Sequence, residues 1–188
     1  MNEIIKKSIK SHLDLINKID NELLDVVNKS SKLILERIKS GGTIFWCGNG
    51  GSSSQASHLS AELLGGMYKK KIKPFKSICI NTDTSFITAW SNDDSFNNIF
   101  SRQLEGLAIG GDIIILLSTS GNSQNILSAA QYANQNEIKV ISLTGFDGGK
   151  IKKISDININ IASKSTQRIQ EMHILVGHII CDIIESSF

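Results

Sequence analysis

The sequence is poor in the residues that mark several common classes of protein. It contains three cysteines in 188 residues, and Cys47, Cys79 and Cys181 stand far apart among apolar neighbours. An odd number of separated cysteines argues against a disulfide framework, and none has the Cys/His spacing of a structural zinc site. We therefore expect reduced core thiols in a cytoplasmic protein.

Long apolar runs are also lacking. No uninterrupted apolar stretch approaches transmembrane length, and the segment from Glu3 to Lys10 mixes acidic and basic residues where a signal peptide would have an apolar core. The formal net charge is +2, with 20% charged and 40% hydrophobic residues, which excludes a disordered chain and an obvious polyanion binder. We expect no membrane and no nucleic-acid partner. The lysine-rich run at 69–73 is expected to be a solvated loop.

Glycine and proline are absent between Asn2 and Ser40. Apolar residues recur there at helical spacing, which predicts two helices interrupted near Asp20 or at 28–31. The apolar stripe is too long to be covered by one small sheet domain. Residues 1–40 are therefore expected to pack against other copies of the chain.

After Gly41 and Gly42 the chain alternates between short β-branched runs and helical patterns. Strands are expected at 43–47, 76–81, 112–117, 139–143 and 157–161, and helices at 52–64, 95–107, 123–136 and 167–185. This alternation is typical of an α/β fold in which helices cover both faces of a parallel sheet. We predict a single α/β domain over residues 41–188, preceded by the helical pair of residues 1–40.

A cluster of hydroxyl groups follows one of the expected strands. The six residues from Ser118 to Ser123 carry four hydroxyls and no acidic side chain, and they lead into a helix. Unpaired amides and the positive dipole end of a helix N-terminus favour an anion. A simple helix cap by Ser120 or Asn122 is the alternative, but four hydroxyls exceed what a cap needs. We therefore predict that this serine loop binds a phosphate group.

A glycine-rich turn at 47–52 follows another expected strand. It lacks both the Gly-x-Gly-x-x-Gly spacing and the lysine that a P-loop requires, so we expect no nucleotide cofactor. Ligands of open α/β sheets bind at the carboxyl ends of the strands. The two turns are therefore predicted to form one binding region.

Candidate catalytic side chains lie on two of the expected helices. His58 and Glu62 are four residues apart and share one helical face, whereas His178 and His173 belong to the closing helix. A lone histidine on an apolar helix is usually a hydrogen-bonded core residue, which is the role that we predict for His173. Two histidines with a glutamate fit a zinc ion that keeps an open position, and they fit metal-free proton transfer equally well.

Taken together, these segments resemble the phosphoheptose isomerases of the sugar isomerase (SIS) fold. The resemblance rests on residues 48–52, 58–63, 91–93, 118–123 and 168–171 with His178, and it covers nearly the whole chain. The serine loop is common to phosphosugar-binding SIS domains, whereas the combination of His58, Glu62, Gln170 and His178 is far more specific. The resemblance implies the interconversion of sedoheptulose 7-phosphate and D-glycero-D-manno-heptose 7-phosphate, the first step of bacterial ADP/GDP-heptose precursor synthesis. The glycan supplied would be lipopolysaccharide, capsule or another heptose-containing polymer.

The resemblance also implies roles for individual residues. Glu62 and His178 correspond to the acid/base pair of the family. The implied substrate contacts are Asn49, Gly50, Gly51, Glu62, Asn92, Asp93, Ser118, Thr119, Ser120, Ser123 and Gln170. The implied zinc ligands are His58, Glu62, Gln170 and His178. A homotetramer with active sites at the subunit boundaries is implied as well.

The chain departs from the family pattern at a few positions. Residues 53–57 lack the histidine and aspartate of many relatives, Gly66 replaces a common arginine, and Gln167 replaces a common aspartate. One alternative is a non-catalytic SIS-domain protein, either an initiator-associating protein of replication control or a phosphosugar sensor, but this alternative predicts loss of the acid/base pair. Another is an isomerase of a pentose 5-phosphate, which would not need Gln170 and His178.

Overall fold

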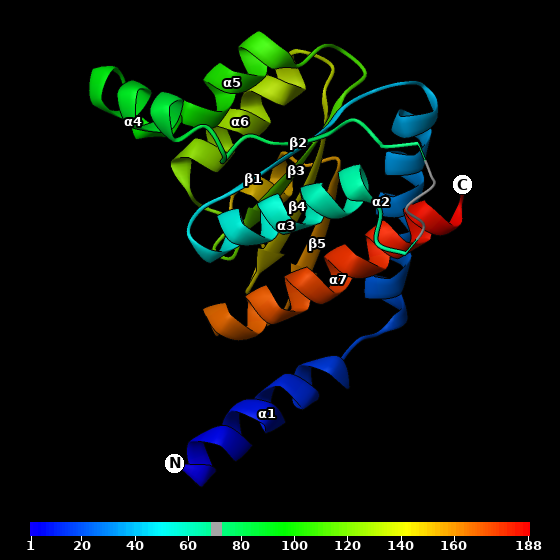
Figure 1. Ribbon diagram of the computed structural model, residues 1–188. Helices are drawn as coiled ribbons and strands as arrows, with labels where there is room; N and C mark the ends of the chain where they lie inside the picture. The colour runs from blue at the N-terminus through cyan, green and yellow to red at the C-terminus, as the bar shows by residue number, and fades with distance from the viewer. Residues whose placement is uncertain (69–72) are drawn as a thin grey trace.

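The protein is built around one parallel sheet. The computed structural model describes residues 1–68 and 73–188 (Figure 1). The described residues form five strands, which have the order β2-β1-β3-β4-β5 and pair in parallel. They are β1 (Ile44–Gly48), β2 (Ser77–Cys79), β3 (Ile113–Ser118), β4 (Lys139–Gly145) and β5 (Ile157–Ile161). The predicted α/β fold is thus confirmed, whereas the loop expected at the lysine run falls largely on residues 69–72, outside the described residues.

The strand register places the two predicted binding turns side by side. Gly48 at the end of β1 pairs with Leu117, and Ser118 at the end of β3 pairs with Thr144 of β4. The carboxyl ends of β1, β3 and β4 therefore lie level at one edge of the sheet. The turn after Gly48 and the loop after Ser118 both leave the sheet at this edge.

Seven α-helices are present in the described residues. They are α1 (Asn2–Ile16), α2 (Asn21–Lys39), α3 (Gly51–Gly65), α4 (Thr84–Asp93), α5 (Ile99–Leu107), α6 (Gln124–Gln135) and α7 (Thr166–Ser186), with 3-10 turns at Phe96–Asn98 and Ile151–Lys153. Helices α2, α3 and α7 cover one face of the sheet, and α5 and α6 cover the other (Figure 1). None of the described helices is long and apolar enough to cross a membrane.

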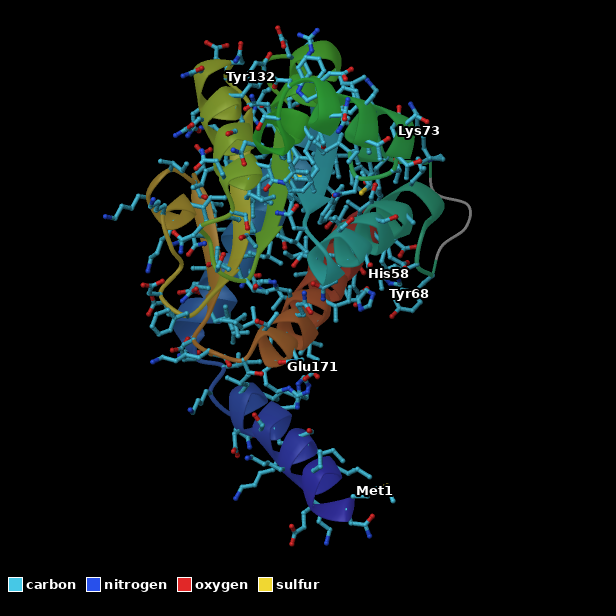
Figure 2. The ribbon with its side chains drawn as sticks, turned by 90° about the vertical axis from the view of Figure 1, so that its left-hand side faces the viewer. Met1, His58, Tyr68, Lys73, Tyr132 and Glu171 are labelled. Atoms are coloured by element: carbon cyan, nitrogen blue, oxygen red, sulfur yellow. The ribbon has the colours of Figure 1, made fainter. Side chains whose placement is uncertain are left out.

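The N-terminal helical pair is interrupted near Asp20, at the first of the two predicted positions. Asp20 caps α2, since its carboxylate accepts a hydrogen bond from the Leu23 amide at 2.9 Å. Helix α1 projects away from the sheet, and none of its residues is buried (Figures 1 and 2). Its contact with α7 includes His12 Nδ1 at 2.7 Å from the Glu171 carboxylate. Most of the apolar side of α1 therefore remains exposed in the single chain.

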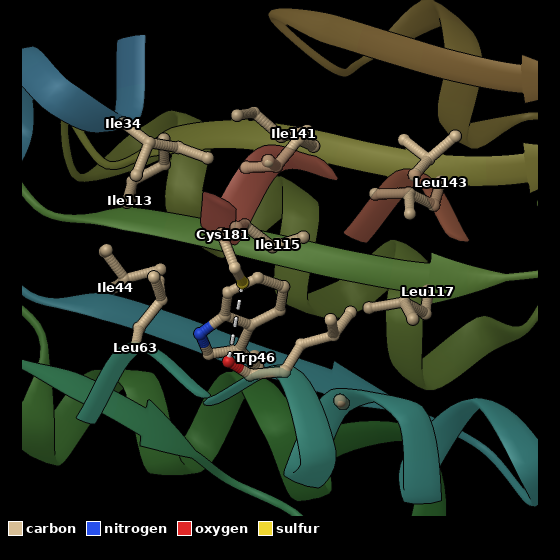
Figure 3. Close-up of a cluster of buried hydrophobic side chains, with 14 of the residues drawn as sticks. Ile34, Ile44, Trp46, Leu63, Ile113, Ile115, Leu117, Ile141, Leu143 and Cys181 are labelled. Carbon is tan, nitrogen blue, oxygen red and sulfur yellow. Dashed lines mark hydrogen bonds between the residues drawn. The ribbon is translucent and has the colours of Figure 1, made fainter. Parts of the chain in front are cut away.

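The central strands are buried along their whole length because helices pack on both faces. On the face toward α3 and α7, Trp46 is the largest buried side chain (Figure 3). Its indole donates a hydrogen bond to Ser77 Oγ at 2.9 Å. Cys181 packs into the same cluster. All three cysteines are buried free thiols, as predicted, and burial raises their pKa values, that of Cys181 to about 12.

One helix was not predicted. The apolar pattern of helix α4 is short, because Phe86, Ile87 and Trp90, which pack partly buried against the core, span little more than one turn. The local signal that remains is its cap, because Asp83 accepts a hydrogen bond from the Phe86 amide at 2.9 Å. Strand β2 is also shorter than predicted, ending at Cys79 because Asn81 turns its side chain toward Gly48.

Candidate active site

Three titratable side chains from two helices meet at one point. His58 Nε2 of α3 lies 2.9 Å from His178 Nε2 of α7 and 3.3 Å from Glu62 Oε1. The two imidazole rings meet edge to face with their centroids 5.0 Å apart. The ligand-capable atoms of the three side chains all lie within 4.8 Å of one another. His58 is exposed on the outer side of α3, next to α7, so the trio is open to solvent (Figure 2).

A glycine allows the two helices to approach this closely. Gly177 of α7 faces Leu59 of α3, and a Cβ at position 177 would come within 2.4 Å of a Leu59 methyl carbon. Cys181, one turn further along α7, lies with its sulfur 3.9 Å from the Leu59 carbonyl oxygen. His178 follows Gly177 directly, and this close packing therefore sets the distance between its ring and His58.

Hydrogen bonds within the serine loop, residues 118–123, hold its backbone in place. The Gly121 amide donates to Ser118 Oγ at 3.2 Å, and the Asn122 amide donates to Ser120 Oγ at 3.2 Å. Ser123 occupies the N-cap position of α6, and within the described part of the chain its side chain makes no capping hydrogen bond. A simple serine cap is therefore not the role of Ser123.

A second loop packs tightly against the serine loop. Gly121 has a φ of +62°, and a Cβ there would lie 2.1 Å from the Gly148 carbonyl oxygen. The Gly145 amide also donates to the Thr119 carbonyl at 3.1 Å. Between the two loops lies an open hollow of about 480 Å³, lined by Thr119, Ser120, Asn122, Phe146, Asp147, Ser163, Lys164, Thr166 and Ile169.

Asparagine side chains join the glycine-rich turn to its neighbours. Asn49 and Asn125 exchange two amide hydrogen bonds of 2.8 and 2.9 Å, which tie the turn after β1 to the first turn of α6. Asn81 likewise accepts from the Gly48 amide at 3.0 Å and donates to the Gly48 carbonyl at 2.8 Å. Sequence reasoning missed Asn81 and Asn125. The available signal was position: Asn81 comes just after a strand, and Asn125 lies in the first turn of a helix, both at the carboxyl edge of the sheet.

The other predicted site residues lie apart from the trio. The side-chain amide of Gln170 lies against Gly51, where a Cβ would come within 2.7 Å of its Nε2. Gln170 precedes His178 by eight residues, a rise of roughly 12 Å along an α-helix, so its place as a fourth zinc ligand stays a prediction. Asn92 and Asp93 are at the end of α4, where they hydrogen bond to each other at 2.9 Å. Their contact with substrate also stays a prediction.

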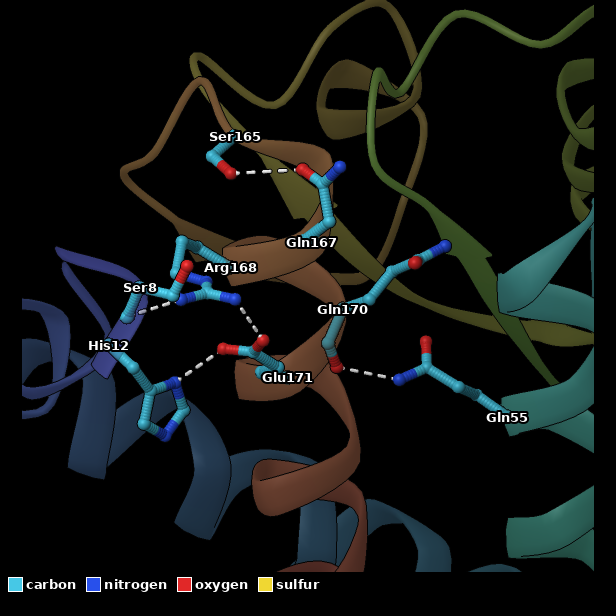
Figure 4. A network of polar contacts seen from close by, with 8 residues as sticks. All are labelled: Ser8, His12, Gln55, Ser165, Gln167, Arg168, Gln170 and Glu171. Atoms are coloured by element: carbon cyan, nitrogen blue, oxygen red, sulfur yellow. Dashed lines mark hydrogen bonds and ion pairs between the residues drawn. The ribbon is translucent and has the colours of Figure 1, made fainter. Parts of the chain in front are cut away.

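Gln55 connects the two parts of the site. Its Nε2 donates to the backbone carbonyl of Gln170 at 2.6 Å, across the interface between α3 and α7 (Figure 4). It stands one turn before His58 on α3 and four residues after Gly51. The sequence indicates only that this position departs from the family pattern, and the structure adds the contact with α7.

His173 has the structural role that was predicted for it. It is fully buried, and its Nε2 donates to the Thr144 carbonyl at 2.9 Å at the end of β4. Burial lowers the pKa of His173 to about 4, with the hydrogen bond to Thr144 acting in the opposite direction. The imidazole is therefore neutral at physiological pH and anchors the strand end that leads to Gly145 and Phe146.

The fold and this site define the class of protein. The sheet is parallel, with the hydroxyl-rich serine loop at its carboxyl edge, and the chain matches the family model described as "SIS domain" over residues 9–145. The chain belongs to this family. Within it the chain belongs to the phosphoheptose isomerases, as its curated relatives show.

The relatives are similar over their whole lengths. The chain is 45% identical to the phosphoheptose isomerase of Helicobacter hepaticus, covering 99% of this chain and 94% of the relative. It is 44% identical to that of Helicobacter pylori strain 26695, covering 100% and 97%. Among solved structures, the phosphoheptose isomerase of Neisseria gonorrhoeae superposes with a TM-score of 0.93 at 35% identity, over 98% of each chain. That of Francisella tularensis gives 0.88 at 33% identity, over 98% of this chain and 96% of the other. The resemblance stated from the motifs is thereby confirmed.

Proposed function

We propose that this protein is an enzyme that interconverts sedoheptulose 7-phosphate and D-glycero-D-manno-heptose 7-phosphate. The observation that carries the proposal is the meeting of a carboxylate and two imidazoles across α3 and α7, on the same fold as a serine loop suited to phosphate. A non-catalytic SIS-domain protein would have no need of the Glu62 and His178 pair. Membership of the phosphoheptose isomerase family supports the same choice.

The reaction moves a carbonyl group between C1 and C2 of the sugar. One proton must leave the carbon next to the carbonyl and return to the neighbouring carbon, while the oxygens exchange a proton as the enediol forms and decays. Glu62 and His178 supply one carboxylate and one imidazole for these transfers. The serine loop and the N-terminus of α6 hold the phosphate at the other end of the sugar.

The trio also fits a zinc ion. Two nitrogen ligands of a tetrahedral zinc ion stand roughly 3.3 Å apart when each bond is about 2.0–2.1 Å long. The separations of 2.9 and 3.3 Å around His58 Nε2 are close to that value, and two imidazoles with one carboxylate leave a coordination position open. His58, Glu62 and His178 would hold the ion. If Gln170, the further ligand implied by the family, fills the open position, substrate would bind as a fifth ligand. When bound, zinc would act as a Lewis acid that polarises the sugar oxygens.

We further propose a cytoplasmic homotetramer whose active sites lie at subunit boundaries, with residues 1–40 serving its assembly. Ile4, Ile5, Ile9 and Leu13 of α1 are each more than half exposed in the single chain, which leaves an apolar side for another copy. Neither Glu62 nor His178 lines the hollow at the serine loop of the described chain, so a neighbouring subunit could complete the site. A monomer detected by light scattering at micromolar concentration would contradict this assembly.

The test is incubation of the purified protein with sedoheptulose 7-phosphate and detection of the aldose product. Unphosphorylated sedoheptulose is the matched control, because it lacks the group that the serine loop binds. Glu62→Gln keeps the size of the side chain and removes the carboxylate, so turnover should fall by about 100-fold or more while sugar phosphate still binds. Near-normal turnover in Glu62→Gln would show that the carboxylate does not transfer the proton.

A further inference from the structure

Phe146 combines two features that proteins usually avoid. Its φ is +55°, in the left-handed region that is an outlier for a bulky residue, and its side chain is 51% exposed. Such a conformation is strained and persists where the surroundings impose it, most often at functional sites. An exposed aromatic ring contributes little packing energy that would offset this strain.

Backbone contacts force Phe146 into this conformation. The Phe146 amide donates to the carbonyls of Ile161 at 3.1 Å and Ser163 at 2.9 Å. Asn160 donates its side-chain amide to the Phe146 carbonyl at 3.0 Å. The preceding residue, Gly145, donates to Thr119 of the serine loop. The ring is thus fixed relative to both the end of β5 and the phosphate loop.

The ring borders the hollow onto which the serine loop opens. Phe146 lines it together with Thr119 and Ser120, and the Lys164 ammonium stands 4.8 Å from the centre of the ring. Asp147 and Thr166 add hydrogen-bonding groups to the same wall. An aromatic face among a few polar groups is a surface that suits the C–H face and the hydroxyls of a sugar.

We propose that Phe146 is a specificity-determining residue that contacts the carbon chain of the substrate next to its phosphate group. The proposal rests on the proposed function, because it takes the serine loop as the phosphate site. The polyhydroxylated chain that leaves the phosphate packs against the ring, and Lys164 adds a positive charge at the rim of the hollow. In this view the strained backbone conformation of Phe146 is retained because it orients the ring toward the sugar.

The experiment compares Phe146→Gly with Phe146→Tyr, using sedoheptulose 7-phosphate as substrate and inorganic phosphate as competitive inhibitor. Phe146→Gly should raise KM about 3- to 10-fold, the range expected for an aromatic contact, with kcat and the phosphate inhibition constant unchanged. Phe146→Tyr keeps the ring and should retain the wild-type KM. The thermal midpoint of Phe146→Gly should equal or exceed that of the wild type, because glycine relieves the strain.

Glu137→Gly is the matched control. Glu137 has a φ of +58° and lies between α6 and β4, at the edge of the sheet opposite the serine loop, so its replacement relieves similar strain without touching the site. It should leave KM unchanged. An unchanged KM in Phe146→Gly would overturn the proposal. Equal rises in KM and in the phosphate inhibition constant would also overturn it, because they would show that the ring only supports the serine loop. Absence of turnover in the wild-type protein would instead refute the proposed function.

Discussion

The buried histidine of α7 should make the protein labile to mild acid. The pKa of His173 falls from 6.5 in the unfolded chain to about 4 in the folded protein because burial disfavours the imidazolium. Below pH 6.5 the unfolded chain takes up a proton at this position, whereas the folded protein does not until the pH is near 4. The contribution of His173 is therefore fully present above pH 6.5 and is lost as the pH falls toward 4.

The loss of unfolding free energy follows from the difference between the pKa values of His173 in the unfolded and folded states. Since one pKa unit corresponds to about 1.4 kcal/mol, the full effect is roughly 3 kcal/mol of unfolding free energy, of which about 2 kcal/mol is lost between pH 7 and pH 5. This is a large share of the ~5–15 kcal/mol that stabilises a typical domain. Urea unfolding of the wild type at pH 7, 6 and 5, at one protein concentration, would measure it.

Two variants isolate the histidine. His173→Gln keeps a donor for the Thr144 carbonyl and does not titrate, so its unfolding free energy should vary with pH about 2 kcal/mol less than that of the wild type between pH 7 and pH 5. His173→Phe should show the same shallow dependence and be less stable by about 1–3 kcal/mol at pH 7, because the buried carbonyl loses its donor. Parallel pH profiles for His173→Gln and the wild type would refute the reasoning.

Three further changes probe the rest of the site. His178→Gln should lower turnover about 100- to 10,000-fold in metal-free protein if the imidazole transfers protons. Loss of bound zinc in this variant, measured by elemental analysis, would identify His178 as a zinc ligand as well. Full activity of the wild type after chelation would contradict an essential metal. Ser123→Ala should weaken phosphate inhibition by roughly 1.5–3 kcal/mol, measured as the inhibition constant, whereas an unchanged constant would place the phosphate elsewhere. Gly177→Ala should lower both the thermal midpoint and turnover, because the added Cβ would lie 2.4 Å from a Leu59 methyl carbon. Wild-type turnover in this variant would show that the close packing of α3 and α7 does not determine the positions of His58, Glu62 and His178.

Motifs in the sequence are sufficient to predict the parts of this site that depend on local structure. His58 and Glu62 share a helical face because they are four residues apart, and this follows from the periodicity of the helix alone. The serine loop is recognisable because its hydroxyls stand between a buried strand and an amphipathic helix. Helix α4 escaped prediction because its apolar residues Phe86, Ile87 and Trp90 span little more than one turn, too short a stretch to establish a helical period.

The sequence by itself thus determined an α/β fold, a serine loop predicted to bind phosphate, two histidines and a glutamate as catalytic candidates, and the resemblance to one family. Only the tertiary structure decided which of these groups meet. His58 and His178 are 120 residues apart and lie 2.9 Å from each other because Gly177 lets α7 approach Leu59, a contact that no local pattern encodes. The same holds for Gln170, whose amide rests on Gly51, and for Phe146, whose strained backbone is imposed by Ile161 and Ser163. Local periodicity sets the face on which a side chain stands, and packing between distant segments sets what that side chain contacts.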